Sequence, residues 1–430
     1  MPSQRVHVHR LLPADPDAVW AVARDFCGLW HPAMATCRAE RDHRGALVRA
    51  FTVEGEETLY REQLTWFSDS DRSLGYTHLQ GIADCDAYDA RLTVSAATGG
   101  GSALTWSAEI TAPARRLDAI ARGTEAVFSA GADALAAASP PTPVSPPLPT
   151  PAPIQPLMLD DLPRLALSIT QAPAGDDDRL CLFLHGIGGN RSNWNEQLGP
   201  AGSLMRAAAM DLRGYGDSSL GARHTIIDDY CDDILRVADH LNAGKLVLVG
   251  LSYGSWIATS FAMRHADRLA GLVLSGGCTG MSEAGPDERE AFRISREVPL
   301  NAGQVPADFA PAVVDAIAGP QAGSAARQAL LHSMAAIPAE TYRDALTCFT
   351  NPLERFDFSR MTMPVLMMTG EHDHLAPPHE IRAVAGRIWD SAPRPDVRFE
   401  VIEGAGHVCN LEAPETFNRH LLAFLQKLTP

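Results

Sequence analysis

Three side chains in the second half of the chain have the types and the order needed for nucleophilic catalysis. Ser252 lies in Gly250-Leu251-Ser252-Tyr253-Gly254, a match to the pattern G-x-S-x-G, while Asp373 ends the segment GEHD and His407 ends GAGH. Serine is a weak nucleophile at neutral pH, so it needs a base within hydrogen-bond reach and an acid that orients this base. The sequence therefore predicts Ser252 as nucleophile, His407 as base and Asp373 as the partner of the histidine.

The segment around Ser252 indicates how the nucleophile is held. Residues 246–249 form a short aliphatic run typical of a strand buried on both faces, and a helix is predicted from the motif to His265. A strand that turns directly into a helix leaves no room for side chains beside it, which explains the two glycines of the motif. Ser252 would then stand at the positive end of the helix, with the backbone N–H of Tyr253 pointing where an oxyanion could form. The alternative is a glycine-rich turn that contains a serine by chance.

The acid and the base are each expected on a loop at the end of a strand. Asp373 follows a predicted strand at 365–369, and His407 follows another at 397–402. Both loops hold rival side chains, which we expect to be solvated or to lie behind the site. The rival acids are Glu371 and Glu403, and the rival imidazoles are His372, His374 and His379.

Strands and helices alternate through the second half of the chain. Further short apolar runs occur at 180–184, 207–210 and 271–275, with helical patterns between them. This alternation predicts a parallel sheet covered by helices, with the active site where the strands end. Residues 276–355 lack strand signals and look helical, so we expect them to form a cap inserted between two core strands.

A proline-rich stretch divides the chain. Residues 139–157 contain nine prolines and no charged residue, a composition that favours an extended polyproline II conformation. We therefore predict an N-terminal domain at 1–138, a linker at 139–157 and a C-terminal domain at 158–430. An SH3-domain ligand is the alternative for the linker, but the basic residue usual in such ligands is missing.

The N-terminal domain has the pattern of an antiparallel sheet with two helices. Strand-like runs occur near 5–12, 46–53, 58–67, 73–79, 90–96 and 103–110. One helix is expected after Asp15, which can cap it, and a longer one after Pro113. The element order and the opening DPDAVWAVARDF (15–26), with Trp30 beyond it, resemble the polyketide cyclase and START-like helix-grip superfamily.

The helix-grip resemblance implies a curved sheet wrapped around the last helix and a hydrophobic small molecule as ligand. It identifies no catalytic residue. We expect five aromatic or histidine side chains to pack in the core of this domain rather than to contact a ligand: Trp30, His31, Trp66, Tyr76 and His78.

The C-terminal domain resembles the α/β-hydrolase family through motifs that occur in family order: HGIGGN (185–190), DLRGYGDS (211–218), GLSYGS (250–255), GEHDHLAP (370–377) and GAGHVCNLEAPETFN (404–418). The resemblance implies that the N–H groups of Ile187 and Tyr253 form the oxyanion hole. It also implies structural roles for His185, Asp211 and Arg213.

Within this family the cap length and the tail from His407 to Asn418 are most similar to the 3-oxoadipate enol-lactonases. The chain departs from them at Ser255 and Trp256, where glycine is common after the motif. A serine rather than an aspartate at 252 argues against epoxide hydrolase and haloalkane dehalogenase activity.

Composition narrows the classes of partner. The chain has 430 residues and a net charge of -16, which disfavours nucleic acid and anionic lipid. It has no apolar run long enough to span a bilayer and no signal-peptide pattern, so we expect a cytoplasmic protein. The eight cysteines show no metal-ligand or disulfide spacing, and no metal or cofactor is expected.

The sequence therefore predicts a serine hydrolase of a hydrophobic ester or (enol-)lactone. Two alternatives stay open. The same triad could serve a C–C bond hydrolase or a cofactor-free perhydrolase, and a non-catalytic small-molecule receptor would need none of the triad.

Overall fold

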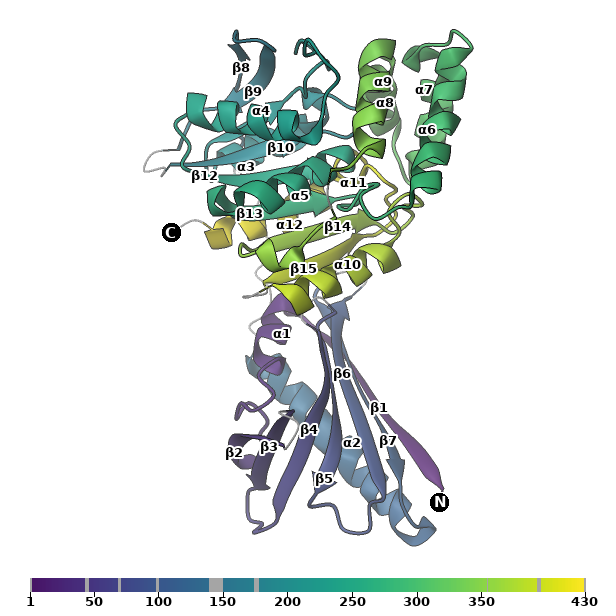
Figure 1. Ribbon diagram of the computed structural model, residues 1–430. Helices are drawn as coiled ribbons and strands as arrows, with labels where there is room; N and C mark the ends of the chain where they lie inside the picture. The colour runs from purple at the N-terminus through teal and green to yellow at the C-terminus, as the bar shows by residue number, and fades with distance from the viewer. Residues whose placement is uncertain are drawn as a thin grey trace. The chain divides into compact units, whose positions relative to one another are not determined.

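The computed structural model describes residues 2–42, 46–68, 71–97, 100–138, 150–173, 178–353, 355–392 and 396–428. The chain forms two compact units, Met1–Pro146 and Pro147–Pro430, each with its own sheet (Figure 1). Of the predicted linker at 139–157, residues 139–149 lie outside the described part of the chain. Among the described residues, no helix is long and apolar enough to cross a membrane.

The N-terminal unit is a seven-stranded antiparallel sheet in the order β1-β7-β6-β5-β4-β3-β2. Its strands are β1 (Ser3–Leu12), β2 (Met34–Arg41), β3 (Leu47–Val53), β4 (Leu59–Ser68), β5 (Ser73–Gln80), β6 (Ala87–Ala96) and β7 (Ser102–Thr111). The predicted antiparallel fold is confirmed, and six of these strands coincide with predicted runs. The seventh, β2, is an edge strand whose side chains are exposed or half-buried, so it lacks the apolar alternation that reveals a strand.

The described residues of this unit also form two helices, α1 (Pro16–Ala23) and α2 (Ala114–Ala138). The side chain of Asp15 accepts a hydrogen bond from the N–H of Asp17 at 2.8 Å and caps α1 as expected. Phe128 of α2 stacks on Trp106 of β7, with ring centroids 4.5 Å apart. The helix therefore packs against the face of the sheet that carries the large aromatic side chains.

The C-terminal unit has an eight-stranded sheet in the order β15-β14-β13-β12-β10-β11-β9-β8. Its strands are β8 (Ile154–Leu159), β9 (Leu165–Thr170), β10 (Arg179–Leu184), β11 (Ala207–Met210), β12 (Lys245–Leu251), β13 (Leu269–Ser275), β14 (Val365–Gly370) and β15 (Val397–Ile402). The last six pair in parallel, whereas β8 and β9 pair antiparallel. The predicted, mostly parallel sheet is confirmed.

Strand β8 begins inside the range predicted as linker, so residues 154–157 are part of the sheet and not of a tether. Pro156 has no N–H to donate, which would exclude it from a central strand. Because β8 lies at the edge of the sheet and pairs only with β9, the missing donor is tolerated. The proline composition that suggested a linker is therefore compatible with an edge strand.

Side chains of the parallel strands alternate between two cores, one on each face of the sheet. Leu180, Leu182 and Leu184 of β10 join the core beneath α4 (Ile227–His240), α5 (Tyr253–His265) and α10 (Pro378–Ser391). Cys181 and Phe183 join the opposite core, beneath α3 (Asn195–Gly202) and α12 (Pro414–Leu428). Burial on both faces explains why these strands read as continuous apolar runs.

In the described part of the chain between β13 and β14 lie four α-helices: α6 (Pro286–Asn301), α7 (Pro306–Ile317), α8 (Ser324–Ala335) and α9 (Ala339–Thr350). They pack as the pairs α6 with α9 and α7 with α8. We call this segment the cap. It stands beyond the strand ends of the sheet (Figure 1), where the chemistry of a parallel sheet is expected.

Candidate active site

Ser252 lies on a strained turn between β12 and α5. Its φ is +52° and its ψ is -112°, a backbone conformation that residues other than glycine rarely adopt. A Cβ on Gly250 would lie 2.4 Å from the carbonyl oxygen of Gly254, and a Cβ on Gly254 would lie 2.2 Å from that of Leu184. Both glycines are therefore required by close backbone contact.

Asp373 and His407 are joined by a hydrogen bond of 2.8 Å between Oδ2 and Nδ1, and both side chains are buried. Oδ1 of Asp373 accepts the N–H groups of Leu375 and Ala376, each at 2.8 Å. An ionised carboxylate can only accept, so Nδ1 of His407 carries the proton and Nε2 is left as the acceptor.

The carboxyl of Asp373 is held in its ionised form. Burial alone would raise its pKa, but the hydrogen bond and charge of His407, together with the two backbone N–H groups, outweigh burial and lower the pKa below its ordinary value. The group is therefore a stable acceptor for the imidazole throughout the neutral range.

The end of β13 brings Ser252 and His407 to one place. The N–H of Ser252 donates to the carbonyl of Ser275 at 2.7 Å. A Cβ on the next residue, Gly276, would lie 3.2 Å from Cε1 and 3.3 Å from Nδ1 of His407. The serine backbone and the imidazole thus flank the same dipeptide, one from β12 and the other from the loop after β15.

The rival side chains lie elsewhere. Glu371 accepts the N–H of Gly404 at 3.0 Å and faces His372 at 3.6 Å, with both side chains more than two-fifths exposed. The remaining rivals, His374, His379 and Glu403, are exposed. Of the two acids on the loop after β14, only Asp373 contacts His407.

The two residues assigned to the oxyanion hole both lie close to Ser252, one next to it in sequence and the other in a neighbouring loop. Tyr253 is the first residue of α5, where a helix leaves its N–H groups without intrahelical partners. Ile187 lies in the loop after β10, and a Cβ on its neighbour Gly186 would be 3.5 Å from Cβ of Ser252. This loop therefore passes directly beside the serine.

His185 and Asp211 make contacts that suit the structural roles implied by their motifs. The N–H of Leu212 donates to Nε2 of His185 at 3.1 Å, so Nδ1 carries the proton and donates to the carbonyl of Gly186 at 2.8 Å. Burial lowers the pKa of this histidine, which keeps it neutral. Asp211 is fully buried and accepts the N–H of Arg191 at 2.8 Å, which fixes the loop after β10.

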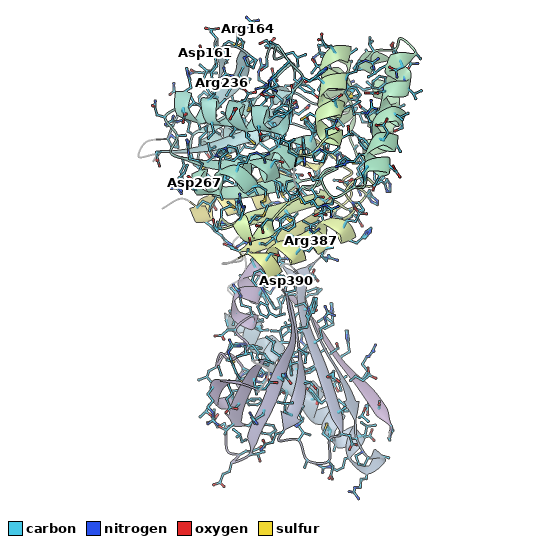
Figure 2. The ribbon with its side chains drawn as sticks, viewed as in Figure 1. Asp161, Arg164, Arg236, Asp267, Arg387 and Asp390 are labelled. Atoms are coloured by element: carbon cyan, nitrogen blue, oxygen red, sulfur yellow. The ribbon has the colours of Figure 1, made fainter. Side chains whose placement is uncertain are left out.

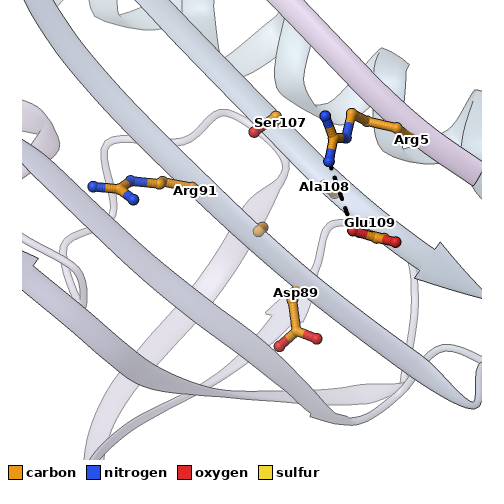
Figure 3. A pocket seen from close by; sticks show the side chains of 7 residues that line it. Arg5, Asp89, Arg91, Ser107, Ala108 and Glu109 are labelled. Atoms are coloured by element: carbon orange, nitrogen blue, oxygen red, sulfur yellow. Dashed lines mark ion pairs between the residues drawn. The ribbon is translucent and has the colours of Figure 1, made fainter.

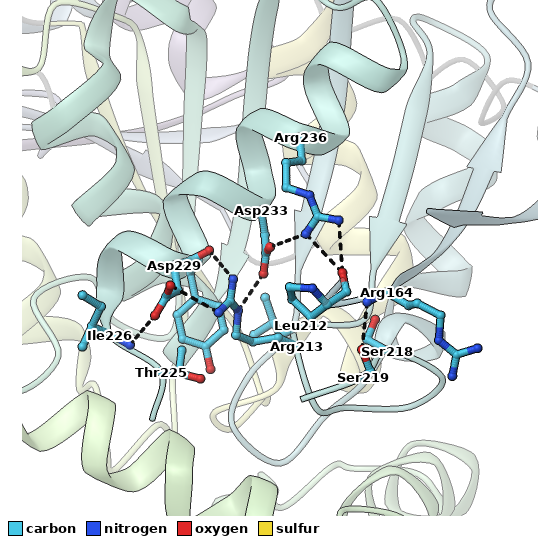
Figure 4. A network of polar contacts seen from close by, with 12 residues as sticks. Arg164, Leu212, Arg213, Ser218, Ser219, Thr225, Ile226, Asp229, Asp233 and Arg236 are labelled. Carbon is cyan, nitrogen blue, oxygen red and sulfur yellow. Dashed lines mark hydrogen bonds and ion pairs between the residues drawn. The ribbon is translucent and has the colours of Figure 1, made fainter. Parts of the chain in front are cut away.

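Arg213 anchors the loop after β11 to α4 (Figure 4). It donates to the carboxylate of Asp233 and to the carbonyl of Asp229, each at 2.8 Å. Arg236 of the same helix bonds Asp233 at 3.0 Å and reaches the loop after β8, which holds Asp161 and Arg164 (Figure 2). These contacts hold the loop after β11 and the helix α4 in place. Both arginines are used in these hydrogen bonds, which suits the structural role implied for Arg213.

Ser255 and Trp256, where the chain departs from the enol-lactonase pattern, both fill structural positions. Ser255 Oγ donates to the carbonyl of Gly250 at 2.7 Å and accepts the N–H of Ser275 at 3.0 Å, which ties β12 to β13 beneath the nucleophile. Trp256 is buried against Phe349 of the cap, and its indole donates to Ser282 at 3.0 Å.

Sequence reasoning missed Glu412, the last residue of the short helix α11 (Cys409–Glu412), whose carboxylate accepts N–H groups around the His407 loop. It lies in the quoted motif GAGHVCNLEAPETFN, and its spacing of five residues from His407 was the available signal.

Two surface depressions stand out in the described part of the chain, and neither is lined by Ser252, Asp373 or His407. One, of about 320 Å³, lies on the solvent face of the N-terminal sheet, where Arg5 of β1 pairs with Glu109 of β7 at 3.8 Å (Figure 3). The other, of about 270 Å³, lies at the start of α6. The described residues form no cluster of three or more histidine, cysteine, aspartate or glutamate side chains suited to a metal ion.

Comparison with known proteins agrees with both units. Residues 181–420 match the model of the alpha/beta hydrolase family, and residues 3–139 match that of the polyketide cyclase / dehydrase and lipid transport family. Both resemblances inferred from motifs are thus confirmed. The sequence is similar to 3-oxoadipate enol-lactonase 2 of Acinetobacter baylyi, with 24% identity over 62% of this chain and 97% of the relative. It is also similar to the putative carbamate hydrolase RutD of Caulobacter vibrioides, with 28% identity over 57% of this chain and 89% of the relative.

Solved structures show the same fold for the C-terminal unit. An esterase from Thermogutta terrifontis superimposes with a TM-score of 0.55 and 24% identity, over 65% of this chain and all of that one. The enol-lactonase from Burkholderia xenovorans gives 0.50 and 20%, over 61% and 96%. Because the family model spans more than half of the sequence, the chain belongs to the alpha/beta hydrolase family and is a hydrolase.

Proposed function

We propose that the protein cleaves a carboxylic ester or (enol-)lactone through an acyl-enzyme on Ser252. The observation that carries the proposal is the buried pair Asp373–His407, whose imidazole flanks Gly276 while Ser252 stands on a strained turn beside Ser275. A fixed imidazole next to a half-buried serine on a strained turn is the arrangement that activates a serine hydroxyl.

The reaction runs in two halves. His407 Nε2 takes the proton of Ser252 Oγ as this oxygen attacks the carbonyl carbon, and the oxyanion lies against the N–H groups of Ile187 and Tyr253. The imidazolium, stabilised by Asp373, gives its proton to the leaving oxygen as the C–O bond breaks. Water then attacks the acyl-enzyme with His407 again as base, which releases the acid and restores Ser252.

The choice of ester or lactone rests on the relatives, which are named as an enol-lactonase and an esterase. An assay of p-nitrophenyl esters of increasing chain length, beside an enol-lactone and a vinylogous diketone, tests it. We expect turnover of the esters or the enol-lactone that is lost in Ser252→Ala. Cleavage of the diketone alone would instead assign a C–C bond hydrolase, and activity that survives Ser252→Ala would overturn the mechanism.

We further propose that the N-terminal unit binds a hydrophobic small molecule on the face of its sheet that packs against α2. A row of polar side chains crosses this otherwise apolar face. Arg49 of β3 stands opposite Glu62 of β4 and Glu62 opposite His78 of β5, and Tyr88 of β6 lies edge-on to His78. A mostly apolar ligand that carries one polar group could pack on the apolar face and form a hydrogen bond with a side chain of this row.

One member of the row, His78, was expected to pack in the core rather than to contact a ligand, but it is only half-buried and has an unused donor. The N–H of Ile82 donates to Nε2 of His78 at 3.0 Å, so Nδ1 carries the proton, and this buried atom has no partner among the described residues. Burial lowers the pKa of His78, which keeps it neutral. A carbonyl or hydroxyl oxygen of a ligand would satisfy this donor.

Tryptophan fluorescence of the full chain tests this second part, because Trp106 lies on the same face. Titration with an aromatic ketone and with the matching hydrocarbon should quench the fluorescence of the wild type, with the ketone bound more tightly. His78→Phe should remove that difference, whereas Asp89→Asn, on the opposite face of β6, should preserve it. Equal binding of both compounds by the wild type would refute a role for the polar row.

A further inference from the structure

The loop that carries His407 is seated directly on the backbone of the cap. The N–H of His407 donates to the carbonyl of Ile317, the last residue of α7, at 2.9 Å. A Cβ on Gly319 would lie 2.4 Å from the nitrogen of Gly406, and a Cβ on Gly406 would lie 2.4 Å from that of Gly319. Neither glycine has a positive φ, so closeness rather than backbone conformation excludes a side chain here.

The carboxylate of Glu412 links the cap segment at 317–319 to the loop that carries His407, and we call this contact the junction. Oε2 of Glu412 accepts the N–H of Gly319 at 2.7 Å and that of Gly406 at 2.9 Å, and Oε1 accepts the N–H of Val408 at 3.1 Å. One of these donors belongs to the segment between α7 and α8, and the other two flank His407. Hydrogen bonds from N–H groups to a carboxylate are stronger than those between neutral groups.

We propose that Glu412 is a positioning residue through which the seating of the cap sets the imidazole of His407. The inference rests on the proposed function, in which His407 is the general base. The cap lies beyond the strand ends, so a substrate bound between the cap and the sheet would contact α7 and α8. Any shift of residues 317–319 reaches His407 through the bond to Ile317 and through Glu412. A seated cap is therefore a condition for a correctly placed base.

A merely structural role for Glu412 predicts a different result. If the carboxylate only stabilised α11, its loss would lower the free energy of unfolding and leave the turnover of the folded enzyme unchanged. A positioning role lowers kcat in folded enzyme and leaves the KM of a small ester nearly unchanged, because such an ester needs few contacts with the cap. Misplacement of a catalytic group by about 1 Å can cost on the order of 10²-fold in rate.

Gly319→Ala tests the junction without touching a catalytic side chain. The added methyl would collide with the backbone of Gly406, so we expect kcat for a small acetate ester to fall about 10-fold to 10²-fold with KM nearly constant. Gly323→Ala is the matched control, since a Cβ at Gly323, in the same segment of the cap, would meet nothing within 4 Å. Wild-type kcat in a folded Gly319→Ala enzyme would overturn the proposal.

Glu412→Ala and Glu412→Gln test the carboxylate. Glutamine keeps one oxygen for Gly319 and Gly406 but turns an NH₂ group toward the N–H of Val408, so its kcat should lie between those of wild type and alanine. The control is Glu415→Ala, at an exposed position in the first turn of α12. Wild-type kcat in folded Glu412→Ala, or no rescue by glutamine, would contradict a positioning role. If Glu412→Ala does not fold, Gly319→Ala and Glu412→Gln decide.

The pH profile of single-turnover labelling of Ser252 by a fluorophosphonate provides the second readout. We expect Gly319→Ala and Glu412→Gln to lower the plateau rate of labelling, and Gly323→Ala and Glu415→Ala to match wild type. Ser252→Ala and His407→Ala are run in parallel. Activity in those two would overturn the proposed function itself, whereas their inactivity together with wild-type labelling of Gly319→Ala would overturn this inference alone.

Discussion

The two sheets of this chain gather polar side chains in opposite ways. In the C-terminal unit the six strands from β10 to β15 are parallel, so the loops after β10, β12, β14 and β15 all lie at one edge of the sheet. Residues as distant in sequence as Ile187 and His407 are therefore assigned to one reaction. In the N-terminal unit the strands are antiparallel, and the polar row Arg49, Glu62, His78 crosses the middle of the sheet through direct cross-strand pairing. The parallel sheet offers a site at its edge and the antiparallel sheet offers one on its face.

The different positions of the polar side chains in the two sheets also lead to different expected effects of substitution on activity and on stability. Side chains at a strand end lie on loops and can be changed with little effect on packing, whereas a charged pair on a buried face is part of the core. We therefore expect Ser252 and His407 to control activity with little effect on folding, and the polar row to control folding of its own unit without controlling hydrolysis of a small ester.

The largest expected effect is on turnover. Ser252→Ala and His407→Ala should each lower hydrolysis by about 10³-fold or more, because the residues act as a unit. Circular dichroism and thermal unfolding should match wild type. His372→Ala, on the exposed part of the same loop as Asp373, is the control and should retain full activity. Near-wild-type turnover by either folded triad variant would refute the assignment.

The next effect is on stability. Arg49 is buried, bonds Glu62 at 2.7 Å and lies over the rings of Phe26 and Tyr76. Arg49→Met leaves the carboxylate of Glu62 buried without its partner, so the free energy of unfolding of the N-terminal unit should fall by about 3–5 kcal/mol.

Adding Glu62→Gln to Arg49→Met should recover part of this loss, and Arg122→Met, at an exposed position of α2, should have little effect. Denaturant unfolding followed by tryptophan fluorescence measures the change. If Arg49→Met were as stable as wild type, the two sheets would not differ in the way described.

The free energy of unfolding should depend on pH through Asp373, the buried acid of the triad. The pKa of Asp373 is lower in the folded protein than the unfolded value of about 3.9, so its ionised form stabilises the fold above that pH. This contribution is lost as the pH falls through the lowered folded pKa. The difference in free energy of unfolding between wild type and Asp373→Asn should therefore shrink as the pH falls from about 5 through the unfolded pKa toward the lowered folded pKa. A difference that stays constant over this range would contradict the ionised pair.

The smallest effect is expected when the two units are separated. A fragment of residues 150–430, which keeps β8 whole, should hydrolyse a small soluble ester like the full chain. It should lose efficiency only toward a bulky hydrophobic ester that the N-terminal unit would bind and hold nearby. Equal loss on both substrates would mean that the N-terminal unit is required for the fold of the hydrolase.

Much of the hydrolase unit could be predicted because its elements leave local signals. Buried parallel strands read as apolar runs, and the turn at Ser252 demands Gly250 and Gly254. The pairing of Asp373 rather than Glu371 with His407 could not be derived from spacing, since both acids follow β14 closely and the choice depends on which one faces the loop after β15.

The interior of the N-terminal unit was harder to predict. Trp66 was expected in the core but is 49% exposed, because the register shifts between Leu64 and Trp66 and the expected alternation fails there. Tyr76 and His31 are buried as expected. The row from Arg49 to His78 was invisible in the sequence, since cross-strand neighbours are 13 and 16 residues apart and belong to no motif.

The edge position of β8 bears on how such a chain can be assembled by gene fusion. The polypeptide enters the hydrolase unit through β8, and three strands, β9, β11 and β10, separate it from β12, which leads to Ser252. A sequence joined ahead of Ala152, whose N–H donates to the carbonyl of Gly199 at 2.9 Å, leads into a strand with a single neighbour and leaves the pairing of the central strands untouched. Recombination at this boundary can exchange the preceding domain while the inherited hydrolase core stays intact.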